Sequence, residues 1–148
     1  MVEGNGIEVL ISAGIAMFIA QAFKVVTHYI FHKTLNYKLM VETGGMPSSH
    51  SAFMMAMAIS VGELKGYESV MFAVALSVAV VVMYDAAGVR RAAGRMAGIL
   101  NQISEDFYTH HPEKLPERLR ELLGHTPTEV VVGGILGAVT AIITLRVI

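Results

Sequence analysis

Four long stretches of this 148-residue chain carry almost no charged side chain, and they constrain its fold more than any other feature. A helix needs roughly 20 apolar residues to cross a hydrocarbon core of about 30 Å. The stretches are apolar on all faces and lack the polar outer stripe of a helix in a soluble bundle. They predict an all-α integral membrane protein with four transmembrane helices. The stretches run from Val9 to Phe23, from Thr43 to Gly62, from Ser69 up to Arg90 with Asp85 between, and from Val130 to Leu145.

The composition agrees with this fold class and excludes several functions. Charged residues make up 16% of the chain, against about 25% in ordinary soluble domains. A net charge of −1 gives no basic field for nucleic acid, so no nucleic-acid partner is expected. The absence of cysteine excludes disulfides, thiolate metal sites and a cysteine nucleophile. At this length, residues 1–148 are predicted to form a single membrane domain.

Alternating span directions bring four helix ends to one side of the membrane: the end of the first, the start of the second, the end of the third and the start of the fourth. Nine of the eleven lysines and arginines fall on this side, which the positive-inside rule places in the cytoplasm. These nine are Lys24, Lys33, Lys38, Arg90, Arg91, Arg95, Lys114, Arg118 and Arg120.

The segment between the third and fourth spans has a different pattern. Its apolar residues recur at i, i+3, i+4, i+7 and i+11, as on one face of a helix. Such a helix is expected to lie on the membrane surface. A second short helix is predicted from Pro116 to Leu123, which gives one or two interfacial amphipathic helices in all. The apolar residues of the first are Met96, Ile99, Leu100, Ile103 and Phe107.

The string TGGMPSSHS, residues 43–51, opens the second span. Serines cap helix starts, and the free amides and dipole of such a start favour anions. His50 stands in the first turn, where it can protonate a leaving oxygen. The string predicts either a phosphate site, with Ser48 and Ser49 as ligands, or an ordinary serine-capped helix with an interfacial histidine.

The string GHTPTE, residues 124–129, opens the fourth span. His125 and Glu129 are four residues apart and can meet on one helical face. The carboxylate can then accept one imidazole N–H and leave the other nitrogen able to attack an electrophile. The alternative is a structural hydrogen bond at a helix start.

The string YDAAGVRRAAGR, residues 84–95, ends the third span. An aspartate within an apolar helix needs a partner, and arginine is the natural ligand for phosphate. Arg90 and Arg91 point about 100° apart on a helix, so only one is expected to hold a given phosphate. The other then binds a lipid headgroup or only marks topology. Asp85 is predicted to support the site.

The first span adds further polar candidates. Gln21 and Lys24 form a polar stripe in its cytoplasmic half and are predicted to support the site, although Lys24 can instead extend to the membrane surface. Lys38 is close enough along the chain to bind the same anion. His28 and His32 have the spacing of a metal pair, but no third ligand can be placed, so no metal or other cofactor is expected.

Taken together, the strings TGGMPSSHS, YDAAGVRRAAG and GHTPTEVVVGGILG resemble the divergent branch of the type 2 phosphatidic acid phosphatase and vanadium-dependent haloperoxidase superfamily. These are small membrane proteins called acid phosphatase/vanadium-dependent haloperoxidase related. The resemblance implies Ser48 and His50 in the acid motif, His125 with Glu129 in the nucleophile motif, and Arg90 or Arg91 in the phosphate cradle.

The chain departs from the superfamily pattern at several points. Ser49 replaces the glycine of the acid motif, and Glu129 replaces the aspartate of the nucleophile motif. Arg91 lies 34 residues before His125 instead of a few, and the Arg-Pro pair is missing, with Lys38 as the only nearby cation to replace its charge.

The sequence therefore predicts a metal-independent membrane phosphatase that hydrolyses a lipid phosphate or pyrophosphate, of the polyprenyl or phosphatidyl class, through a phosphohistidine. The alternative is a lipid-phosphate-binding protein without catalysis. Haloperoxidase chemistry is a remote third option. Gly133 and Gly137 have the GxxxG spacing of close helix packing, within a chain or between two chains, so the sequence leaves open whether a homodimer forms.

Overall fold

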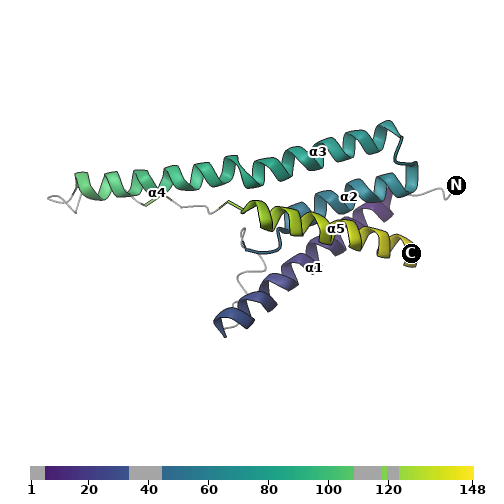
Figure 1. The fold of residues 1–148 in the computed structure, drawn as a ribbon, viewed down its shortest axis with the longest axis horizontal. Helices are drawn as coiled ribbons and strands as arrows, with labels where there is room; N and C mark the ends of the chain where they lie inside the picture. The colour runs from purple at the N-terminus through teal and green to yellow at the C-terminus, as the bar shows by residue number, and fades with distance from the viewer. Residues whose placement is uncertain (1–5, 34–44, 109–117, 120–123) are drawn as a thin grey trace.

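The computed structural model describes residues 6–33, 45–108, 118–119 and 124–148, and every regular element in these ranges is a helix. Three of the helices lie together and a long rod made of two helices runs beside them (Figure 1). The expected all-α architecture is confirmed. The helices are α1 (Gly6–His32), α2 (Ser49–Lys65), α3 (Val70–Ala87), α4 (Val89–Phe107) and α5 (Pro127–Val147).

The centre of the bundle is α2, which packs against α1, α3 and α5. Its buried face consists of alanines, serines and glycine, and the matching face of α1 carries Ala13, Ala16 and Ala20. The largest side chains that are wholly buried are serines. Without large side chains between them the helix backbones approach closely, which is how helices associate in membranes.

Glycines on α5 make the closest of these approaches. A side chain on Gly133 would overlap the carbonyl oxygen of Ser48, and one on Gly137 would overlap that of Ala52. The GxxxG pair therefore packs within the chain, between α5 and α2.

Large apolar side chains lie on the outside of the bundle. Phe18, Val81 and Ile135 are each at least 60% exposed. This distribution suits hydrocarbon surroundings, because lipid tails are as apolar as the side chains themselves. Among the described residues, three helical stretches are long and apolar enough to cross a membrane, namely Gly6–Ile30, Val70–Phe107 and Pro127–Val147. The structure thus supports a membrane protein.

The predicted count of four spans is not confirmed, because α2 is not among these stretches. The helix starts only at Ser49, after the N-cap Ser48, so the first residues of the apolar block from Thr43 lie before it. The remaining 17 residues would extend about 26 Å, less than a typical hydrocarbon core.

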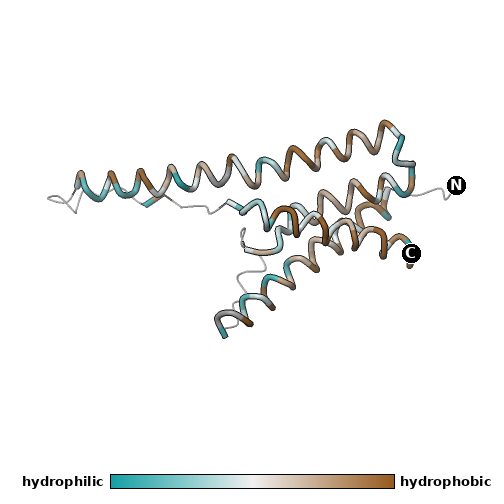
Figure 2. Tube along the Cα trace, viewed as in Figure 1, coloured by the Kyte–Doolittle hydropathy of each residue, from teal (hydrophilic) through white to brown (hydrophobic). Residues whose placement is uncertain are grey.

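The expected surface helix forms, but its expected placement on the membrane is not seen. Only Gly88 separates α3 from α4, and the two continue almost in line (Figure 1). Apolar and polar residues alternate along α4 (Figure 2), and its apolar stripe is exposed. On another face, the Asn101 side-chain amide pairs with the backbone of Leu119 through two bonds of 2.9 Å. Of the short helix predicted from Pro116 to Leu123, only residues 118–119 lie within the described ranges.

Candidate active site

The starts of α2 and α5 meet the end of α3 at one end of the bundle, and α1 joins them through Lys24, eight residues before its last residue, His32. The Ser48 N–H donates to the Glu129 carbonyl at 3.0 Å, which joins the start of α2 to that of α5. The His125 N–H donates to the Ala86 carbonyl at 3.1 Å, which joins the start of α5 to the end of α3. From α1, the ammonium group of Lys24 reaches Ser49. Polar groups from four helices are therefore held together by backbone geometry.

The predicted contact between His125 and Glu129 is present. His125 Nδ1 lies 3.0 Å from Glu129 Oε2, and His125 is only 5% exposed. A carboxylate only accepts hydrogen bonds, so the Nδ1–H donates and the lone pair of the neutral ring lies on Nε2. This is the arrangement that a histidine nucleophile requires.

The same carboxylate also caps α5. Glu129 Oε2 accepts from the Thr126 N–H at 3.1 Å, and Thr126 Oγ1 accepts from the Glu129 N–H at 3.3 Å. This reciprocal pair is a capping box, which the pattern Thr-x-x-Glu would have indicated but which the sequence analysis missed. Because it fixes the carboxylate, it also fixes the ring of His125.

Lys24, which the sequence analysis placed in support of the site, is only 3% exposed, so the alternative in which its side chain extends to the membrane surface is not seen. Its Nζ donates to Ser49 Oγ at 3.4 Å, and the carboxylate of Glu129 lies within its electrostatic reach. A buried ammonium group is costly unless anions or acceptors surround it. The cluster of Lys24, Ser49, His125 and Glu129, here called the polar cluster, therefore combines a buried ammonium group with an imidazole that a carboxylate orients.

Ser48 serves the fold. It is fully buried, and its hydroxyl oxygen accepts from both the N–H and the hydroxyl of Ser51, at 3.3 and 2.9 Å. Together with its N–H bond to α5, these contacts make it the cap of α2. Before this cap the chain turns at Gly45, whose φ of +78° lies in the left-handed region that favours glycine.

His50 lies on the exposed face of α2. Ser48 and Ala52 define the face toward α5, because their carbonyl oxygens contact its glycines. His50 lies outside that face, about 100° around the helix from Ser49, whose hydroxyl contacts Lys24.

The other predicted site residues are placed as follows. Gln21 is half-buried about one turn before Lys24, and Asp85 is half-buried in the last turn of α3. Arg90 and Arg91 lie in the first turn of α4, with side chains outside the described parts, and Lys38 lies wholly outside them. Within the described ranges, no three histidine, aspartate or glutamate side chains are grouped so that they could hold a metal ion.

The comparison with known families covers most of the chain. Residues 6–140 match the model of the Divergent PAP2 family. The chain belongs to this family. The resemblance seen in the three sequence strings is thereby confirmed. Membership of the Divergent PAP2 family indicates a phosphatase-like membrane protein. The polar cluster lies within the matched region.

A bacterial relative agrees with this assignment. The chain is 38% identical over 144 residues to the uncharacterized membrane protein YuiD of Bacillus subtilis (strain 168), covering 90% of this chain and 91% of the relative. No solved structure matches the chain significantly.

Proposed function

We propose that this member of the Divergent PAP2 family is a phosphatase for a membrane lipid phosphate or pyrophosphate, of the polyprenyl or phosphatidyl class, with its site on the cytoplasmic side. The observation that carries the proposal is the His125–Glu129 pair beside the buried ammonium group of Lys24. The pair supplies a nucleophile in the required tautomer, and the ammonium group supplies charge for the phosphate oxygens.

The reaction proceeds in two steps. Nε2 of His125 forms a bond to phosphorus while the bond from phosphorus to the lipid alkoxide breaks, and the alkoxide takes a proton from protonated His50. Water then attacks the phosphohistidine and returns a proton to His50 as the phosphorus–nitrogen bond breaks. Inorganic phosphate and the lipid alcohol leave, and both histidines regain their starting states.

Neutralisation of the phosphate oxygens is the other requirement, because phosphoryl transfer depends mainly on positioning and charge. Lys24 and the first-turn amide of Ser49 are assigned this role on the geometry of the cluster. Lys38 and one of Arg90 and Arg91 are assigned to it on the sequence alone.

The direct test is capture of the intermediate. Purified protein in detergent is mixed with a radiolabelled polyprenyl or phosphatidyl phosphate and quenched in alkali, where a phosphohistidine survives. Label mapped to His125, together with steady release of phosphate, supports the proposal. A protein that turns over substrate without labelling any histidine contradicts the mechanism.

Replacing Lys24 by methionine is expected to weaken phosphate binding about 10- to 100-fold, because a hydrogen bond to a charged group contributes about 1.5–3 kcal/mol. Methionine fills the buried space without a charge, so the fold should persist. The measurement is the inhibition constant for vanadate, together with KM for the lipid phosphate.

The matched control for Lys24 is Lys33→Met, at an exposed position one residue past the end of the same helix. This variant should leave both constants within about twofold of the unmodified protein, since an exposed lysine contributes little. If Lys24→Met retains the wild-type inhibition constant, Lys24 does not bind phosphate.

The acid role of His50 predicts a dependence on the leaving group. His50→Ala should slow release from an alkyl phosphate by about 10²–10⁴-fold, the usual contribution of a general acid. The rate of release from p-nitrophenyl phosphate should fall much less, because p-nitrophenolate is a weak base that leaves without a proton. Equal losses on both substrates would show that His50 is not the acid, and His50→Gln provides a second variant without a titratable ring.

A lipid-phosphate binder without catalysis is the second candidate. It is favoured by the face of α2 on which His50 lies and by the use of Ser48 within the bundle. It predicts that vanadate and anionic lipid bind while no substrate releases phosphate. In that case Arg91→Ala abolishes binding and His125→Ala does not, the reverse of the expectation for an enzyme.

A further inference from the structure

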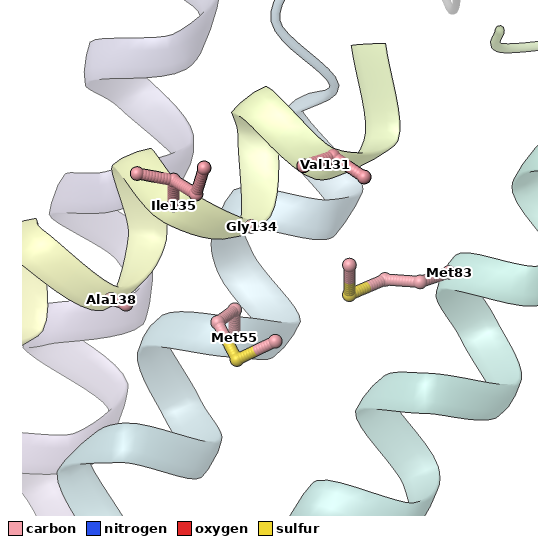
Figure 3. A pocket seen from close by; sticks show the side chains of 6 residues that line it. All are labelled: Met55, Met83, Val131, Gly134, Ile135 and Ala138. Atoms are coloured by element: carbon pink, nitrogen blue, oxygen red, sulfur yellow. The ribbon is translucent and has the colours of Figure 1, made fainter. Parts of the chain in front are cut away.

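An apolar crevice lies between α2, α3 and α5, with a volume of about 250 Å³. The side chains of Met55 on α2 and Met83 on α3 approach each other across it, and α5 forms the remaining wall (Figure 3). The lining contains no polar surface, and the crevice opens at the outside of the bundle. The α5 wall consists of Val131, Gly134, Ile135 and Ala138.

Along α3 and α5, the crevice begins within one turn of the residues that hold the polar cluster. On α5, Val131 lies two residues after Glu129, and on α3, Met83 lies three residues before Ala86, whose carbonyl holds His125. At 1.5 Å per residue, these lining residues are about 3–5 Å along their helices from the cluster. A ligand with its polar end at His125 would therefore have its adjoining apolar part at this crevice.

Gly134 allows the crevice to have its present shape. A side-chain carbon on Gly134 would lie 3.0 Å from the terminal methyl carbon of Met83, so a larger residue would push that side chain aside. Methionine side chains are flexible and adapt to irregular apolar partners. The lining can therefore accommodate hydrocarbon chains that differ in branching or unsaturation.

We propose that this crevice holds the part of a lipid's hydrocarbon chain nearest the phosphate while the phosphate is at the polar cluster. This inference rests on the proposed function and extends it, because it makes the hydrocarbon chain a determinant of substrate choice. The crevice lies in a bundle whose outer surface is apolar, so the surrounding medium is itself hydrocarbon. A chain attached to the bound headgroup enters at high effective concentration.

A single chain fits the crevice better than a helix of a second copy does. Its volume is below the roughly 300–1,000 Å³ of pockets that enclose drug-sized ligands, which suits a few methylene groups. A partner helix would instead need a long face with backbones about 8–10 Å apart. The crevice takes up only about two turns of α5.

The test fills the crevice and compares substrates. Ala138→Leu adds bulk to its α5 wall, and the measured quantity is the ratio of kcat/KM for a long-chain alkyl phosphate to that for methyl phosphate, which has no methylene group to place in the crevice. This ratio should fall at least tenfold, since each buried methylene contributes about 0.8 kcal/mol, close to fourfold in affinity. Ala73→Leu, on an exposed part of α3, makes the same change outside the crevice and should leave the ratio unaltered.

A photolabel separates this inference from the proposed function. A long-chain alkyl phosphate with a diazirine near its phosphate should label Met55, Met83 or Ile135. Unlabelled alkyl phosphate should compete for this labelling, and the corresponding alcohol should not.

The outcomes distinguish the two proposals. Phosphate release with labels elsewhere, or with a ratio unchanged in Ala138→Leu, overturns the role of the crevice and leaves the phosphatase proposal intact. Specific labelling without phosphate release keeps the crevice as a lipid-phosphate site and overturns the phosphatase. Labels in the crevice for which the alcohol competes equally overturn the link to phosphate.

Discussion

Replacing His125 by alanine should lower phosphate release by at least about 10⁴-fold and abolish the phosphoenzyme. Loss of a nucleophile removes the covalent route, and comparable deletions in other hydrolases cost up to about 10⁶-fold. The backbone N–H of residue 125 still binds the Ala86 carbonyl, so the start of α5 should keep its place. Rates on polyprenyl and phosphatidyl phosphates and trapping of the labelled intermediate measure the effect.

Glu129→Gln distinguishes orientation of the imidazole from capping of the helix. Glutamine is accepted at this position of a capping box, so α5 should still begin at Pro127. Its amide no longer favours the tautomer with the proton on Nδ1 and cannot stabilise a charged ring, so the rate should fall about 10²–10⁴-fold, as when the aspartate of a serine-protease triad becomes asparagine. The thermal midpoint should change little.

The matched control for His125→Ala is His111→Ala. It removes a histidine from the segment between α4 and α5 and should keep more than about half the activity. A phosphoenzyme that persists in His125→Ala would assign the nucleophile elsewhere and remove the basis of the proposed mechanism. If the unmodified protein shows no turnover and His125→Ala binds vanadate as tightly as it does, the results favour a lipid-phosphate-binding protein without catalysis.

The part of the site that depends on local spacing could be predicted from the sequence. His125 and Glu129 are one helical turn apart, so any helix starting near Pro127 brings them together. The meeting of the starts of α2 and α5 with the end of α3 also follows from chain direction alone. The orientation of His50 could not be predicted, because it depends on which face of α2 packs against α5, and tertiary contacts of Ser48 and Ala52 fix that face.

Tertiary packing decides the other two features that the sequence alone does not, the burial of Lys24 and the placement of α4. The burial of Lys24 depends on how closely α1 approaches Ser49, and that approach follows from small residues on two helices far apart in the chain. The placement of α4 depends on the backbone at Gly88, which continues the direction of α3 although the local sequence allows several angles. Its apolar stripe identifies it as a helix in either arrangement, as predicted.

Replacing Gly137 by alanine should cause a large loss of stability for the addition of a single methyl group. The new carbon would overlap the carbonyl oxygen of Ala52, which belongs to the backbone of α2 and cannot rotate away. Overpacking usually costs about 1–3 kcal/mol, and a clash with backbone belongs at or above the upper end. At about 2–4 °C per kcal/mol for a chain of this size, the thermal midpoint in detergent should fall by roughly 6–12 °C.

Gly14→Ala is the matched control for this loss, because nothing lies within 4 Å of the carbon it would add to α1. Alanine favours helix over glycine by about 0.5–1 kcal/mol, so this variant should be at least as stable as the unmodified protein. Both variants add one methyl group to a glycine within a helix, and they differ in what that group meets. A midpoint lowered equally in both would mean that contact between α5 and α2 does not hold the bundle together. A midpoint unchanged in Gly137→Ala would mean that the two backbones lie farther apart than the structure places them, and the polar cluster at their starts would lose its geometric basis.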